Sequence, residues 1–161
     1  MVTRAEEIVR SLALEPHPEG GRYREFFRSG AAVAPGDGRG ARAALSAIYF
    51  LLRAGETSRW HAVRSDEQWT FLEGDPVELL VLDRASLALT THRLGAPGRR
   101  GIATVVVPGR SWQAARPAGS HVLVTCTVGP GFDFADFEFM ADDPDAAARL
   151  RREAPALALL L

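Results

Sequence analysis

The chain has 161 residues and a formal net charge of −1, which allows one domain with a sizeable core and excludes a general attraction to nucleic acid or anionic membranes. All 19 basic side chains are arginines, which excludes chemistry that needs a Schiff-base lysine. Cys126 is the single cysteine, so neither an internal disulfide nor a thiolate metal cluster can form. The charged first segment, MVTRAEEIVR, and the lack of an apolar run of ~20 residues predict a cytoplasmic protein.

Residues 1–13 are predicted to contain a short amphipathic helix. Thr3 and Glu6 have the spacing of a capping box. The segment EPHPEGG ends this helix, because its two prolines and two glycines cannot continue it. Residues 22–28 are typical of a strand, whereas residues 29–43, which are rich in Gly, Ala and Pro, predict a mobile loop that could cover a pocket.

From residue 44 onward the chain has the pattern of short strands. About nine strand-length segments, separated by turn residues at ~8–12-residue intervals, predict an all-β sandwich or barrel. Near the end, Asp142 or Asp143 as N-cap and Pro144 in the first turn predict a helix. The apolar tail PALALLL is expected either to pack on the sheet or to form a subunit contact. We therefore expect a single domain over 1–161, with a barrel at 14–140 and a helix and tail at 141–161.

The segment GETSRWHAVRSDEQWTFLEG holds the most informative pair of polar residues. Ser65 and Asp66 favour a turn, and a hairpin there would place His61 late on one strand and Glu67 early on the next. Trp69 lies on the same side of its strand as Glu67, because side chains alternate along a strand. We therefore expect the pair in a site with aromatic walls, where low polarity shifts pKa values and suits acid–base chemistry.

This segment resembles the first cupin motif, and the resemblance extends along most of the chain. The spacing that matches the motif runs through Gly55, His61, Val63, Glu67 and Gly74. A second segment, VVVPGRSWQAARP, resembles the second cupin motif. Together with PHPEGGRYRE, SAIYFLL and TCTVGPGFDFADFEF, these segments resemble the small single-domain cupins of the cupin-5 group over about residues 12–140. The resemblance implies a cupin double-stranded β-helix, a jelly-roll barrel, with short N- and C-terminal helices.

The chain also departs from the metal-binding cupins. Val63 replaces the second histidine of their His-x-His, Gln113 aligns with the histidine of the second motif, and Arg110 stands where glycine is usual. The resemblance carries only His61, Glu67 and Gln113 onto the metal positions. These three could hold a divalent transition metal with water completing the shell. Because an amide oxygen is a weak ligand, we expect no metal cofactor and keep a metal centre as the alternative.

Besides the catalytic candidates His61 and Glu67, five residues are candidates for contacting a ligand: Arg59, Trp69, Gln113, Tyr49 and Glu138. For Tyr49 and Trp69 a core position is the stronger alternative. Gln113 could instead satisfy backbone groups inside the barrel. Asp133 and Asp136 are expected in a solvated acidic turn.

The other histidines and the cysteine receive separate predictions. His17 lies in a motif of the cupin-5 group, and we expect it either to shape its loop or to close the pocket of the same or a neighbouring subunit. His92 and His121 lie outside the motifs and are expected to be structural or exposed. Cys126 alternates with valines and is expected to be inert core.

Three functions are compatible with these residues. The first is metal-independent binding of a small polar metabolite, with His61 as general acid or base and Glu67 orienting it or returning the proton. The resemblance to sugar epimerases and isomerases of the cupin superfamily implies a sugar or nucleotide-sugar substrate. The alternatives are a metal-dependent isomerase, lyase or dioxygenase, and a non-catalytic binding module. The expected partners are a small-molecule ligand and a second copy in a homodimer, with no nucleic acid and no membrane.

Overall fold

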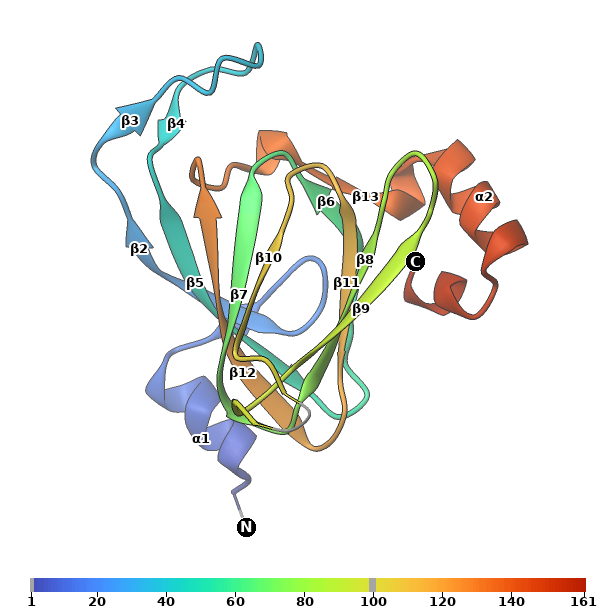
Figure 1. The fold of residues 1–161 in the computed structure, drawn as a ribbon. Helices are drawn as coiled ribbons and strands as arrows, with labels where there is room; N and C mark the ends of the chain where they lie inside the picture. Colours follow the sequence, from blue (N-terminus) through green and yellow to red (C-terminus); the bar gives the residue numbers. More distant parts are fainter. Residues whose placement is uncertain (1, 99–100) are drawn as a thin grey trace.

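The computed structural model describes residues 2–98 and 101–161, and most of its regular structure is antiparallel β-sheet. A six-stranded sheet contains, in spatial order, β1 (Glu15–Pro16), β2 (Arg22–Arg28), β5 (Ser46–Arg53), β12 (His121–Gly129), β7 (Asp66–Gly74) and β10 (Thr104–Val107). A five-stranded sheet contains β13 (Phe137–Phe139), β6 (Ser58–Val63), β11 (Trp112–Pro117), β8 (Val77–Leu82) and β9 (Leu89–Leu94). The two sheets curl round a common interior (Figure 1), which confirms the predicted jelly-roll barrel.

Helices lie at both ends of the chain, on opposite sides of the barrel (Figure 1). The helical segments are α1 (Arg4–Ser11), η1 (Phe134–Asp136), η2 (Met140–Asp142), α2 (Pro144–Glu153) and η3 (Leu157–Leu160). The predicted capping box of Thr3 and Glu6 is present at α1, and Asp143 caps α2 by accepting a hydrogen bond from the Ala146 N–H. Among the described residues, no helix combines the length and the apolar character needed to cross a membrane.

Several strands are buried on both faces, which explains their continuous apolar runs. In β8, Leu79 belongs to the cluster between the two sheets, whereas Leu80 packs with Trp60 and Trp112 on the outer face. The C-terminal tail covers this outer face, because Leu160 is buried there and the Trp60 indole N–H donates to the Leu157 carbonyl at 2.8 Å. The tail therefore packs on the sheet, the first of its two predicted positions.

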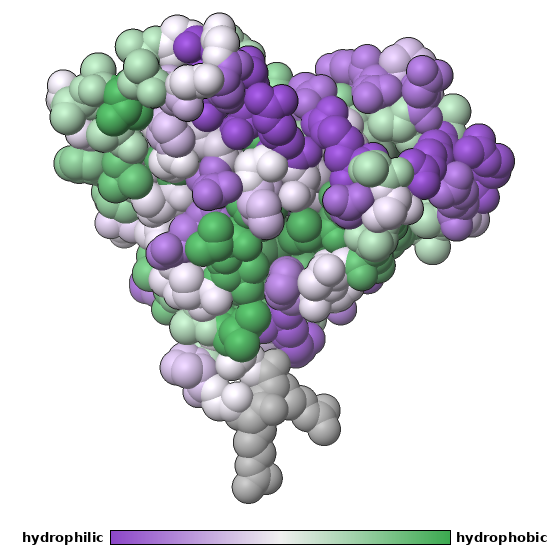
Figure 2. Space-filling model, turned by 45° about the horizontal axis from the view of Figure 1, so that its top comes forward, coloured by the Kyte–Doolittle hydropathy of each residue, from purple (hydrophilic) through white to green (hydrophobic). Residues whose placement is uncertain are grey.

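The segment predicted as a mobile loop contains a small hairpin, formed by β3 (Ala32–Val33) and β4 (Arg42–Ala43), which projects from one end of the barrel (Figure 1). Arg39 and Arg42 bind Asp136 with N–O distances of 2.9 Å. Asp136 is only 4% exposed, so the prediction of a solvated turn was wrong for this residue. Two guanidinium groups compensate its burial. Hydrophilic side chains run across this end of the molecule (Figure 2).

Candidate functional site

A cavity of about 440 Å³ opens at the end of the barrel from which the β3–β4 hairpin projects. Its volume is within the size range of small-molecule sites. Its lining residues come from both sheets and from the segment after β12. They are His17, Glu19, Tyr23, Glu25, Arg28, Ser46, Ile48, His61, Val63, Glu67, Cys126, Val128, Phe132, Asp133, Phe134 and Phe137. Both catalytic candidates are in this set, so the structure brings His61 and Glu67 to one cavity as predicted.

His61 is held in one tautomer by its neighbours. Its side chain is buried on β6, with Nδ1 2.7 Å from the backbone carbonyl of Arg59. A carbonyl oxygen can only accept a hydrogen bond, so Nδ1 carries the proton. The other ring nitrogen, Nε2, lies 3.2 Å from Oε2 of Glu19. Phe137 stacks on the ring at a centroid distance of 5.3 Å, which limits rotation of the imidazole.

Glu19, which sequence reasoning missed, is the carboxyl partner of His61. It lies in the turn between β1 and β2, where Gly20 has a φ of +114° and a Cβ would stand 2.0 Å from the Thr57 carbonyl oxygen. This glycine lets the turn approach β6 closely, which brings the Glu19 carboxyl into the barrel. Ser58 donates its hydroxyl proton to Oε1 at 2.8 Å. Glu19 lies in PHPEGG, a segment of the family resemblance, and this position was the signal in the sequence that could have identified it.

Burial sets the protonation of this pair. Desolvation raises the pKa of Glu19 to about 8, although the Ser58 hydrogen bond and the charge of Arg59 act in the opposite direction. Desolvation lowers the pKa of His61, against the opposing effects of Glu67 and the Arg59 carbonyl. At neutral pH the stable arrangement is therefore a protonated Glu19 that donates to the unprotonated Nε2 of His61.

Glu67 enters the cavity from the opposite sheet and is held by an amide. The Trp69 indole N–H donates to Oε1 of Gln113 at 3.1 Å, and because indole is only a donor this fixes the orientation of the amide. The amide NH₂ then donates to Oε2 of Glu67 at 2.5 Å. Desolvation raises the pKa of Glu67, while the nearby His61 lowers it.

The predicted metal set of His61, Glu67 and Gln113 does not fit this arrangement. The Gln113 oxygen faces the Trp69 indole N–H, and the NH₂ group that faces Glu67 has no lone pair available for a cation, so the amide is not oriented as a metal ligand beside Glu67. Within residues 2–98 and 101–161, His, Cys, Asp and Glu side chains form no group of three or more that could hold a metal ion. We therefore derive no metal chemistry at this site.

The hairpin predicted for this segment is wrong, although the turn at its centre is present. β6 pairs with β11 and β13 in the five-stranded sheet, whereas β7 pairs with β10 and β12 in the six-stranded sheet. The chain changes sheets at Arg64 and Ser65. His61 and Glu67 therefore approach the cavity from opposite walls instead of sharing one face. In addition, Glu19 occupies the position beside His61 that was expected for Glu67.

None of the five predicted ligand contacts lines the cavity. Trp69 and Gln113 are buried and hold Glu67 in place, and the other three point away from the cavity. Tyr49 is on the outer face of β5, where it packs against Phe26 at a centroid distance of 4.4 Å and joins the cluster under α1. The Arg59 guanidinium lies 4.4 Å from the Phe139 ring centroid and is turned away from the cavity lining. Glu138 is exposed and pairs with Arg84. Strand alternation explains the positions of Tyr49 and Glu138, which fall on the outward faces of β5 and β13. Alternation does not hold at Arg59, because the register between β6 and β11 shifts between Ser58 and His61.

His17 lines the cavity of its own chain and also shapes the turn, so both roles predicted for it are combined. Its Nδ1 accepts the Glu19 backbone N–H at 3.2 Å, and its ring lies edge-on to Tyr23 at 4.5 Å. Desolvation lowers the pKa of His17 to about 4, with a smaller effect of His61 in the same direction. His92 and His121, predicted to be structural or exposed, are half-buried and lie outside the cavity lining.

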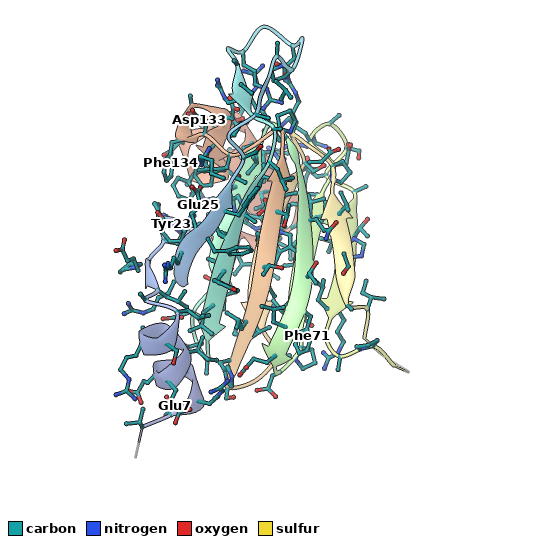
Figure 3. All side chains as sticks on the ribbon, turned by 90° about the vertical axis from the view of Figure 1, so that its left-hand side faces the viewer. Glu7, Tyr23, Glu25, Phe71, Asp133 and Phe134 are labelled. Atoms are coloured by element: carbon teal, nitrogen blue, oxygen red, sulfur yellow. The ribbon has the colours of Figure 1, made fainter. Side chains whose placement is uncertain are left out.

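The mouth of the cavity combines aromatic and charged side chains. Tyr23 and Glu25 on β2 lie below Asp133 and Phe134 at one margin of the six-stranded sheet (Figure 3). The Arg28 guanidinium is already paired with Glu25, at 2.6 Å. Cys126 is buried as predicted, but it also lines the cavity floor beside Glu67, so it is not only core. Desolvation raises the pKa of its thiol, which keeps it protonated.

Two antiparallel sheets that enclose a cavity lined by titratable side chains define a barrel of the cupin type. The chain belongs to the Cupin_5 family of the cupin superfamily (DUF985), whose model matches residues 6–140. A hypothetical protein from Leishmania major is 31% identical, with a TM-score of 0.82 over 98% of this chain and 96% of that protein. A protein from Shewanella oneidensis is 32% identical, with a TM-score of 0.83 over 98% of this chain and 94% of that protein.

More distant structures share the fold alone. Oxalate decarboxylase from Bacillus subtilis is 11% identical, with a TM-score of 0.60 over 91% of this chain and 36% of that protein. The capsular polysaccharide assembling protein CapF from Staphylococcus aureus is 12% identical, with a TM-score of 0.58 over 78% of this chain and 31% of that protein. A search of curated proteins found no match.

Proposed function

We propose that this protein binds a small, polar, uncharged metabolite of the sugar class in its barrel and moves a proton on it, as an epimerase or isomerase does. The observation that carries the proposal is the placement of two acid–base groups on opposite walls of one cavity. Glu19 and His61 share a proton on one wall, at a separation of 3.2 Å, and Glu67 stands on the other. Groups on two sides of a bound carbon can remove a proton from one face and supply one to the other.

The charge of the lining supports a neutral ligand. Four carboxyl groups line the cavity: Glu19, Glu25, Glu67 and Asp133. Arg28 is the one arginine among the described lining residues, and it is paired with Glu25. A nucleotide-sugar would bring phosphate charge into this acidic surrounding, so the sugar alone is favoured. Aromatic rings at Tyr23, Phe132, Phe134 and Phe137 offer apolar faces to a sugar ring.

In the proposed reaction, the Glu67 carboxylate removes a proton from the carbon next to a carbonyl group of the ligand. The electron pair moves into the carbonyl to give an enolate. The Glu19–His61 pair then supplies its shared proton to the opposite face of the same carbon, and the carbonyl re-forms. Proton exchange with water returns Glu67 and the pair to their starting states. Each positioned acid or base of this kind contributes about 10²–10⁴-fold in rate.

Hydrogen–deuterium exchange tests this proposal directly. We expect a neutral aldose or ketose, incubated with the protein in deuterated buffer, to gain deuterium at the carbon next to its carbonyl, as followed by NMR. Glu67→Gln is expected to slow the exchange by about 10²-fold or more, because an amide cannot accept the proton. Glu153→Gln, an exposed change on α2, is the matched control and is expected to leave the rate unchanged.

Two results would contradict the enzyme proposal. Saturable sugar binding without exchange would instead support a non-catalytic binding module. If none of the neutral sugars tested binds or exchanges, the proposed substrate class is also wrong.

Metal analysis gives an independent prediction. Because the Gln113 oxygen faces Trp69 and its NH₂ group faces Glu67, we expect untagged protein purified without chelators to carry well below one equivalent of any transition metal, and the exchange reaction to survive exhaustive chelation. Elemental analysis of the parent, His61→Ala and Glu67→Ala measures this. One equivalent of metal in the parent that is lost in both variants would establish the metal-dependent alternative.

The homodimer and the cytoplasmic location stay predictions. Phe26 and Phe27 on β2 are about half exposed, next to the margin of the six-stranded sheet. A second copy that covered them would remove this apolar surface from water, which supports the dimer.

A further inference from the structure

A second hollow, of about 350 Å³, lies beside the barrel cavity and has the opposite electrostatic character. It is lined by Arg64, Arg84, Arg110, Ala135, Asp136, Phe137 and Glu138. Phe137 is the one lining residue that the two hollows share among the described residues. The hydrophilic band in Figure 2 crosses this end of the molecule. The three arginines that surround this hollow indicate an anionic ligand.

An internal carboxylate already shows how such an anion would be held. Oδ2 of Asp37 lies 3.6 Å from Nη2 of Arg64 and 3.4 Å from Nη2 of Arg110. Its other oxygen, Oδ1, lies 3.2 Å from Nε of Arg39. Three guanidinium groups, from the loop, from the link between β6 and β7 and from the link between β10 and β11, therefore converge on one carboxylate.

Asp37 lies at the glycine-flanked tip of the loop, whereas the ion pairs that anchor this loop are made by Arg39 and Arg42. It stands between Gly36 and Gly38, which have φ values of +77° and +86°, and a Cβ built at either would meet no atom within 4 Å. Glycines in this conformation give the tip of the loop alternative backbone states at low cost. The carboxylate can thus leave the arginines without disturbing the packing of the barrel.

The arginines also retain hydrogen-bonding capacity that Asp37 does not use. The Nε atoms of Arg39 and Arg64 are buried and make no hydrogen bond within the described residues. A buried donor without a partner has an unfavourable free energy, which a larger anion with more oxygens would relieve. A tetrahedral phosphate presents more acceptor oxygens than the planar carboxylate of Asp37.

We propose that Arg39, Arg64 and Arg110 form a binding site for a phosphate group, and that Asp37 occupies this site as a competing internal anion until the phosphate displaces it. Inorganic phosphate and the phosphate group of a small ester both present the negatively charged oxygens that this site would bind. The site does not depend on the proposed sugar chemistry, because none of the three arginines lines the barrel cavity.

Isothermal titration calorimetry in phosphate-free buffer at low salt tests the site, with inorganic phosphate and methyl phosphate as the two probes. Asp37→Asn keeps the size of the side chain and removes the competing charge, so we expect it to bind the probes about ten-fold more tightly than the parent. The double variant R64Q/R110Q is expected to lose at least about ten-fold in affinity. Arg116→Gln removes an exposed arginine outside the proposed site, paired with Glu78, and serves as the control.

The gain of affinity in Asp37→Asn cannot result from misfolding, so it keeps the test decisive if R64Q/R110Q folds poorly. Tighter binding of methyl phosphate than of inorganic phosphate would identify an ester as the ligand class, and equal binding would identify phosphate itself. Absence of saturable binding in both the parent and Asp37→Asn overturns the proposal. An equal loss of affinity in Arg116→Gln and R64Q/R110Q also overturns it, because the binding would then be general surface attraction.

Discussion

Asp136→Ala is expected to lower the free energy of unfolding by about 3–5 kcal/mol, the cost of removing one partner from a buried ion pair. Asp136 accepts hydrogen bonds of 2.9 Å from both Arg39 and Arg42. The Arg39 side chain is only 5% exposed, so the substitution would leave a buried guanidinium without its main counter-charge. Urea denaturation at neutral pH, followed by tryptophan fluorescence, measures the loss.

Asp145→Ala provides the matched control for this prediction. Asp145 is an exposed aspartate in the first turn of α2, and its removal is expected to cost less than about 1 kcal/mol. If the two variants lose similar amounts of stability, the loop segment 29–43 is not held by Asp136 and the ion-pair argument fails.

Glu19→Gln is expected to remove a large pH dependence of stability. In the folded protein the pKa of Glu19 is raised from 4.5 to about 8 by desolvation. Between these values the folded state keeps a proton that the unfolded state has released, so stability falls as the pH rises. Over the full interval the loss from this one group is about 5 kcal/mol, and between pH 6.5 and pH 8 it is about 2 kcal/mol.

The comparison with Glu19→Gln over this narrower interval isolates Glu19, because both proteins carry the same histidines. The pKa of His17 is lowered to about 4, so most of the stability gained from its deprotonation is present by pH 6.5. We expect the parent to lose about 2 kcal/mol more than Glu19→Gln between pH 6.5 and pH 8. Glu153→Gln is expected to follow the parent, because Arg149 lowers the pKa of Glu153 and moves its titration into acid. Parallel profiles for the parent and Glu19→Gln would show that Glu19 is ionised in the native state.

Local patterns predicted the two α-helices and most of the strands of this fold, but not the hairpin of β3 and β4. The capping box at Thr3 and Glu6 and the N-cap at Asp143 act within one helical turn, and both are present. The strand predicted over residues 22–28 coincides with β2. The family resemblance added the barrel topology, which depends on strand pairings too distant in sequence for periodicity to reveal.

Errors arose where burial depends on distant partners. The turn at Ser65 was recognised, but a turn residue does not determine whether the flanking strands pair with each other or with other strands. In the sequence Asp136 has the surroundings of a surface residue. Its burial depends on Arg39 and Arg42, which are about a hundred positions away in the chain and contact it only in the folded protein. Glu19 was missed because its burial follows from the close approach of the Gly20 turn to β6, which no local pattern encodes.

The change of sheet between β6 and β7 has a mechanical consequence for the site. In a hairpin, the two acid–base groups would move together on one rigid surface. Here His61 and Glu67 belong to separate layers, so the gap between them follows the spacing of the layers. For the proposed reaction, the thickness of the ligand must therefore match the spacing of the layers. A thinner molecule leaves one of the two groups out of reach, and a thicker one does not fit between the sheets.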